Sequence, residues 1–209
     1  MAKVEGVRER VHYLLYDSIF VAEPGTGTPA NPPGTFESAL TDPRVIRFFV
    51  DTQNKTKLET NMQAAGVLPS QNTFEARAMR VAMSSVLFRK GDTQQEKAKQ
   101  VIEEPEVVAA LIYNTTTTLY VGEKVMFEGP TFMFPSGAGV QSGFPTVVNH
   151  GNPDPQATFR FAEPVVIERQ QNFRVEMAFP RGVPRRLANA TGPLHVWVLL
   201  DGYLMRDVQ

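Results

Sequence analysis

The three histidines, His12, His150 and His195, carry the side chains best suited to binding a metal ion or transferring a proton. A metal site needs several donor groups close together, and metal-dependent enzymes built on β-sheets commonly combine two histidines with a carboxylate. The sequence contains no His-x-His, His-x-Asp or His-x-Glu motif, and the three histidines are far apart in the chain. We therefore expect ordinary hydrogen-bonded or exposed histidines and no metal site.

Other catalytic motifs are also missing from the sequence. It has no cysteine and no Gly-x-Ser-x-Gly motif, so it lacks two common nucleophile arrangements. The glycines of residues 137–143 do not have the spacing of a dinucleotide-binding motif, and residues 23–28 lack the Gly-Lys-Ser/Thr of a phosphate-binding loop. We expect no catalytic or cofactor-binding residues and predict that the chain is not an enzyme. A β-sandwich enzyme with an unfamiliar site is the alternative.

A group of arginines is one of two features suited to binding a partner. Arg181, Arg185 and Arg186 lie in the segment Arg-Gly-Val-Pro-Arg-Arg, between two predicted strands. Three guanidinium groups at one turn could bind phosphates or pair with carboxylates of a neighbouring chain. The alternative is a turn that only aids solubility. No basic arm or RNA-binding aromatic motif accompanies the arginines, so we expect no sequence-specific nucleic-acid recognition.

The second feature is a group of phenylalanines, Phe132, Phe134 and Phe144, in a segment without charged residues that is rich in Gly and Pro. If these rings are exposed, they form an apolar patch of the kind that marks an interface. The alternative is that Phe132 and Phe134 belong to a strand and pack inside the protein. We take the three phenylalanines and the three arginines together as the candidate assembly interface.

The elements that must position these residues are mainly β-strands, because the dominant hydrophobic period is two. Residues 173–179 have apolar side chains at alternate positions, which predicts a strand with one buried face. The same pattern over residues 118–128 predicts one strand with a bulge at Gly122. The run from Leu194 to Leu200 is apolar on both faces apart from His195, which predicts a central strand. Further strands are predicted at residues 11–21, 45–50, 74–88, 158–161 and 165–167.

One segment breaks the strand pattern. Residues 93–104 are rich in Gln, Glu and Lys, and Asp92 or Thr93 can cap a helix at its start. Pro105 suits the first turn of a second helix. We predict one short helical insertion at about residues 93–113, within an all-β, antiparallel, jelly-roll-like sandwich that forms a single domain over residues 1–209.

Composition narrows the possible classes further. The chain has 209 residues, with 21 Lys and Arg against 22 Asp and Glu, and a net charge of −1. This charge argues against a protein that coats nucleic acid by charge alone, and the lack of cysteine excludes a disulfide scaffold. Charged residues interrupt the first ten positions, and the longest uncharged stretch is broken by proline. We therefore expect neither a signal peptide nor a transmembrane segment, and synthesis in a cytoplasm.

Taken together, the sequence resembles the single jelly-roll structural proteins of tailless icosahedral viruses, particularly those of bacteria. The resemblance depends on the length, the neutral and cysteine-free composition, the Pro- and Gly-rich loops and the helical insertion. It also depends on the strand entered through Val165–Val175 and on a last strand that runs through Val198–Leu204 almost to the end of the chain.

The resemblance implies a capsid subunit that self-assembles and is located in the virion. Its partners would be copies of itself and other virion proteins, with no cofactor. The family often has a basic N-terminal arm that contacts the genome, and this chain lacks one. Genome contact would then be indirect, across another protein layer or an internal membrane that the subunit touches peripherally. The alternative function is a carbohydrate- or receptor-binding β-sandwich module, such as a spike or tail component, that uses Trp197, Tyr203 or the loop phenylalanines as stacking surfaces.

Overall fold

The computed structural model describes residues 8–21, 36–37, 40, 42, 44–84, 106–139, 152–190 and 194–207. Within these ranges most residues are in β-strands, and helices are few and short. Residues 106–112 are helical. The other elements, in chain order, are β1 (Arg8–Val21), β2 (Val45–Phe48), β3 (Asn72–Ser84), β4 (Thr116–Val121), β5 (Lys124–Pro130), the 3-10 helix η2 (Thr131–Met133), β6 (Ser136–Gly139), β7 (Asn152–Ile167), β8 (Phe173–Ala178), α2 (Arg185–Ala188) and β9 (Leu194–Asp207).

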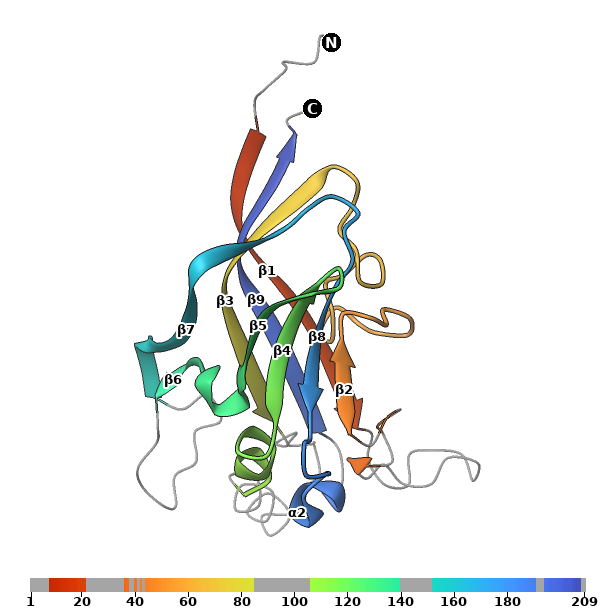
Figure 1. Cartoon of the computed structure of the whole chain (residues 1–209), viewed down its shortest axis with the longest axis vertical. Helices are drawn as coiled ribbons and strands as arrows, with labels where there is room; N and C mark the ends of the chain where they lie inside the picture. The colour runs from red at the N-terminus through yellow and green to blue at the C-terminus, as the bar shows by residue number, and fades with distance from the viewer. Residues whose placement is uncertain are drawn as a thin grey trace, which may run out of the picture.

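Two antiparallel sheets form a sandwich, with strand orders β1-β9-β3-β7-β6 and β2-β8-β4-β5 (Figure 1). The pairs β1 with β9, β2 with β8, β3 with β7 and β4 with β5 make the chain one long antiparallel ribbon. The ribbon is wrapped so that β9 also pairs with β3, and β8 also pairs with β4. This connectivity is that of a jelly roll, to which β6 adds a short edge strand. The predicted fold class is therefore confirmed.

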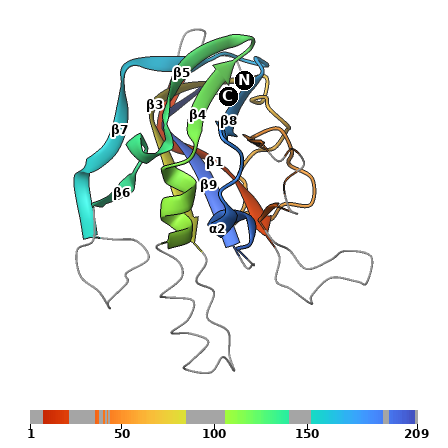
Figure 2. The ribbon, with the colours of Figure 1, turned by 60° about the horizontal axis from the view of Figure 1, so that its bottom comes forward.

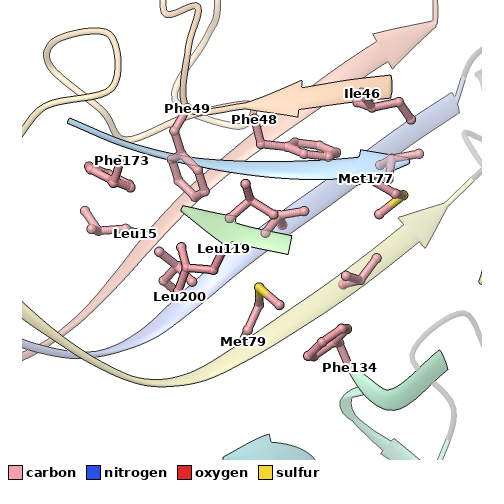
Figure 3. Packing of buried hydrophobic residues seen from close by; sticks show 14 of the residues in the cluster. Leu15, Ile46, Phe48, Phe49, Met79, Leu119, Phe134, Phe173, Met177 and Leu200 are labelled. Carbon is pink, nitrogen blue, oxygen red and sulfur yellow. The ribbon is translucent and has the colours of Figure 1, made fainter. Parts of the chain in front are cut away.

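The hydrophobic core lies between the two sheets (Figure 3). Leu15, Met79 and Leu200 project into it from the five-stranded sheet, and Phe48 and Leu119 project from the four-stranded sheet. Strand β8 alternates buried and half-buried side chains along its whole length, as the period of two predicted. Strand β9 is a central strand, also as predicted, because it lies between β1 and β3.

The prediction of a single strand over residues 118–128 is wrong. Gly122 has a φ of +59° and lies in a tight turn that joins β4 to β5. Val121 therefore pairs with Lys124 across a hairpin. A register shift after Leu119 then places Val125 on the outward face, where it is exposed. A glycine that adopts the left-handed conformation without strain serves a turn as readily as a bulge, and spacing alone does not distinguish them.

Strand β7 unites the two strands predicted at residues 158–161 and 165–167. Its pairing with β3 is irregular, because β3 has a bulge between Ala76 and Ala78. The same bulge brings the carbonyl oxygen of Glu75 against Gly202 of β9, where a Cβ atom would overlap it. Gly202 is therefore required for the close approach of these two central strands.

Residues 106–112 confirm the second predicted helix, whereas residues 93–105 lie outside the described part of the chain. Val107 and Leu111 are buried on the face of this helix that packs on the sandwich. The hydroxyl of Thr115 donates a hydrogen bond to the carbonyl oxygen of Leu111 at 2.7 Å and so ties the end of the helix to β4.

A buried carboxylate fastens the segment after β2 to β1. Asp17 is completely buried, and its Oδ2 accepts a hydrogen bond from the backbone N–H of Phe49 at 2.6 Å. Its Oδ1 pairs with Nζ of Lys55 at 2.8 Å. Phe49 has a φ of +70°, which a bulky residue adopts only where its surroundings hold it. The Asp17 carboxylate is one of the groups that hold it.

Candidate interaction surface

Two of the elements that carry predicted interface residues, α2 with Arg185 and Arg186 and η2 with Phe132, lie toward one end of the sandwich, away from the described ends of the chain (Figure 1). Figure 2 turns this end forward and shows α2 and the helix of residues 106–112 below the strands. Nε of Arg186 in α2 lies 3.0 Å from Oε2 of Glu106, which links the two helices. The 3-10 helix η2 follows β5 toward the same end.

Three exposed side chains at this end form what we call the aromatic patch: Tyr113, Phe132 and Met133. Phe132 in η2 is 52% exposed, and Tyr113, just after the helix, is 69% exposed. The centroids of their rings are 5.8 Å apart, so they form one surface, which Met133 extends. Thr131 is buried, and its hydroxyl bonds to the hydroxyls of Thr115 and Thr117 at 2.7 and 2.8 Å. These bonds anchor the first residue of η2 while the next two face solvent.

Phe134 does not belong to this surface, which corrects the prediction that placed it at the interface. Phe134 is 1% exposed, and its ring packs edge-on against the rings of Phe127 and Phe159. The ring centroids are 5.6 and 5.3 Å apart. Phe132 and Phe134 would share one face in a strand, but the 3-10 turn between them turns one outward and the other inward. Phe144 lies outside the described residues.

The three arginines are exposed at the same end of the molecule. The ion pair of Arg186 with Glu106 joins side chains that are 47% and 68% exposed, so it contributes less than about 1 kcal/mol to stability. Within the described residues, Arg181 and Arg185 make no ion pair. These two guanidinium groups therefore have no carboxylate partner among the described residues, whereas that of Arg186 pairs with Glu106.

Two of the aromatic residues of the alternative function, Trp197 and Tyr203, project from the outward face of the five-stranded sheet. Trp197 is half-buried, stacks on His195 at 4.7 Å and donates a hydrogen bond from Nε1 to the carbonyl oxygen of Leu58. The guanidinium of Arg10 lies 4.0 Å above the Tyr203 ring. These contacts occupy ring surface that a stacked sugar would need, so they argue against Trp197 and Tyr203 as sugar-stacking surfaces.

His195 is the buried titratable residue of this face. Desolvation by burial lowers its pKa below the ordinary value, against a smaller opposite effect of Glu59. Its Nδ1 is buried and has no hydrogen-bond partner. A neutral, enclosed imidazole at pH 7 follows, consistent with packing between Phe20 and Trp197.

Sequence reasoning missed a polar network on this outward face, because it joins residues from three strands. Glu75 pairs with both Arg10 and Arg77, and Asp201 pairs with both Arg80 and His12. The alternating charged residues at the start of β1 were a sequence signal for this network. Their partners could not be found from the sequence, because Glu75 is 65 residues from Arg10 and Asp201 is 189 residues from His12. We call four arginines of this face, Arg10, Arg77, Arg80 and Arg160, the arginine cluster.

Three further features of the described residues concern ligand pockets, metal sites and membrane-spanning helices. A pocket of about 40 Å³ opens between Tyr13, Leu68 and Leu204, far smaller than the several hundred Å³ of typical ligand pockets. No group of three or more His, Cys, Asp or Glu among these residues is arranged to hold a metal ion. None of the helices in the described ranges is long and apolar enough to cross a membrane. Neither a scan against models of protein families nor a search of curated proteins found a match to the sequence.

Proposed function

We propose that this protein is a structural subunit that assembles with copies of itself into the icosahedral capsid of a tailless bacterial virus. In this proposal the protein acts by assembly rather than catalysis, and its partners are further copies and other virion proteins. The observation that carries the proposal is the jelly-roll connectivity together with the exposed aromatic patch at one end of the sandwich.

The sandwich supports assembly because it is a rigid body with an extensive core. Long strands such as β1 and β9, each of 14 residues, hold the helices of one end in fixed positions. A subunit that contacts several neighbours around closed symmetry axes needs such a rigid frame. Each contact can then be weak, because many form at once.

The aromatic patch supports assembly through its exposed area. Tyr113 and Phe132 are large rings that would lose little side-chain entropy when a neighbouring subunit covers them. Aromatic residues, Met and Arg are the types enriched at protein interfaces, and this end carries all of them. Arg181 and Arg185 supply guanidinium groups for forked hydrogen bonds to carboxylates of a neighbour.

The direct test is the particle yield of the purified chain, measured by light scattering after size-exclusion chromatography and by negative-stain electron microscopy. The wild-type chain is expected to form rings or shells as its concentration rises. Replacing Tyr113 and Phe132 with serine is expected to reduce particle yield at least tenfold. The matched control is Val166→Ser, which removes an exposed apolar side chain from the outward face of the five-stranded sheet. A wild-type chain that stays monomeric at all concentrations refutes the proposal.

The arginines allow a second comparison within the same assay. Arg181→Ala with Arg185→Ala is expected to lower particle yield, because these groups face a partner. Arg186→Ala is expected to have a smaller effect, because it breaks an exposed pair within the chain. Equal yields for the double variant and the wild type would remove Arg181 and Arg185 from the interface.

A further inference from the structure

The outward face of the five-stranded sheet carries an excess of positive charge. Cross-strand partners share a face, and the register aligns Ala78 of β3 with Asp201 of β9 and with Arg160 of β7. Arg10, Arg77 and Arg80 contact carboxylates on the same face. The register places Arg8 on this face as well, opposite Asp207, so the face carries five arginines against three acidic positions, Glu75, Asp201 and Asp207.

The carboxylates orient the arginines and leave donors free. Nη2 of Arg10 and Nη2 of Arg77 lie 3.2 and 2.6 Å from oxygens of Glu75. Both guanidinium groups also lie over the ring of Tyr203, at 4.0 and 5.1 Å. A guanidinium has five N–H donors, so one shared carboxylate cannot saturate two of them. Arg160 is exposed and makes no ion pair with a described residue.

The outward face of the four-stranded sheet has no such excess of positive charge. The strands of the four-stranded sheet present Arg47 and Arg174 beside Glu128 and Glu176. Asp42 also pairs with Arg47, and Glu123 lies near enough to Arg174 to help raise its pKa, so this face carries no excess of positive charge. Of the two outward strand faces, the one with the arginine cluster is therefore the one suited to an extended anionic partner.

We propose that the arginine cluster binds the phosphodiester backbone of a nucleic acid without reading its bases. Planar guanidinium groups held in place match the paired oxygens of phosphates, and the strands of this sheet carry arginines and no lysine. The four arginines lie at different positions along the strand direction. An extended polyanion that runs along the sheet would therefore contact several of them. The aromatic ring within the arginine cluster, that of Tyr203, lies beneath two guanidinium groups, which fits backbone contact rather than base stacking. This inference is independent of the assembly proposal.

The test is the binding of a fluorescein-labelled oligo(dT) to the full chain, followed by fluorescence anisotropy between about 50 and 200 mM salt. The wild-type chain is expected to bind with an affinity that falls steeply with salt, because phosphate contacts release counterions. Replacing Arg77 and Arg160 with glutamine removes two such contacts. The slope of log K against log salt is then expected to become shallower by about 1.4, from roughly 0.7 per phosphate of a single strand. The matched control, Arg47→Gln with Arg174→Gln, is expected to keep the wild-type slope.

Three results would overturn the inference: no binding at the lowest salt, an equal loss in the control variant, or competition by polyglutamate as strong as by unlabelled oligo(dT). The last result would assign the face to an acidic protein. Arg160→Glu alone provides a second variant, since it breaks no ion pair of the described residues and is expected to weaken binding at least tenfold. Particle yield is measured on the same variants, so a loss of nucleic-acid binding with normal assembly separates the two proposals.

Discussion

Replacing Lys55 with methionine removes the cation that faces the buried carboxylate of Asp17. The carboxylate is completely buried, and it would keep the backbone N–H of Phe49 as a partner but lose its counter-ion. Breaking a buried pair by removing one partner costs about 3–5 kcal/mol, because the remaining charge is uncompensated. Lys55→Met is therefore expected to lower the free energy of unfolding by about that amount.

Asp17→Asn changes the same pair from the other side. The amide oxygen still accepts the hydrogen bond of Phe49, and Lys55, whose side chain is 16% exposed, can turn toward water. A cost of about 1–3 kcal/mol is expected, smaller than that of Lys55→Met. The double variant Asp17→Asn with Lys55→Met is expected to be more stable than Lys55→Met alone, because it leaves no buried charge unpaired.

Urea unfolding followed by tryptophan fluorescence measures these changes, since Trp197 is the single tryptophan of the chain. Trp197 also bonds to Leu58 in the loop that contains Lys55, so it reports on this part of the fold. Lys57→Met is the matched control, because this exposed lysine lies in the same loop, and a change within about 0.5 kcal/mol is expected. The reasoning is refuted if Lys55→Met costs no more than the control, or if the double variant is less stable than Lys55→Met.

Three further predictions concern the core and the outward face. Phe134→Ala is expected to cost about 3–5 kcal/mol in urea unfolding and Phe132→Ala almost nothing, because only the first ring is buried; similar costs would contradict the placement of the two rings. Gly202→Ala is expected to lower the melting temperature more than Gly129→Ala, because its Cβ meets backbone rather than a movable ring; equal shifts would contradict this. Burial lowers the pKa of His195, so the unfolded chain binds a proton first and stability is expected to fall as pH drops below about 6.5. His195→Leu should flatten this fall in urea midpoints, and an unchanged pH profile would assign it to other groups.

Strand positions were largely predictable from the sequence because alternation is a local property of the extended backbone. Residues 173–178 illustrate this, since their buried side chains repeat every second position as predicted. The hairpin at Gly122 was not predicted, because an exposed edge strand such as β5 has a weak burial pattern. A left-handed glycine in such a segment fits more than one structure.

The candidate interaction surface was predictable only in outline. Helix α2, with two of the arginines, and η2, with Phe132, do lie toward one end of the sandwich, but the sequence could not separate Phe132 from Phe134. That separation depends on the hydroxyl of Thr131, which bonds to Thr115 and Thr117, 16 and 14 residues earlier in the chain. No local pattern records a contact of this kind.

The sequence by itself determined an antiparallel β-protein with a neutral charge, a helical excursion and a partly buried last strand, because composition and period act on neighbouring residues. The tertiary structure alone decided which side chains meet. Only the register between β1 and β9 brings His12 to Asp201, 189 residues away, and only the bulge of β3 makes Gly202 indispensable. These features follow from the pairing of distant strands, which depends on the packing of the whole chain rather than on any one segment.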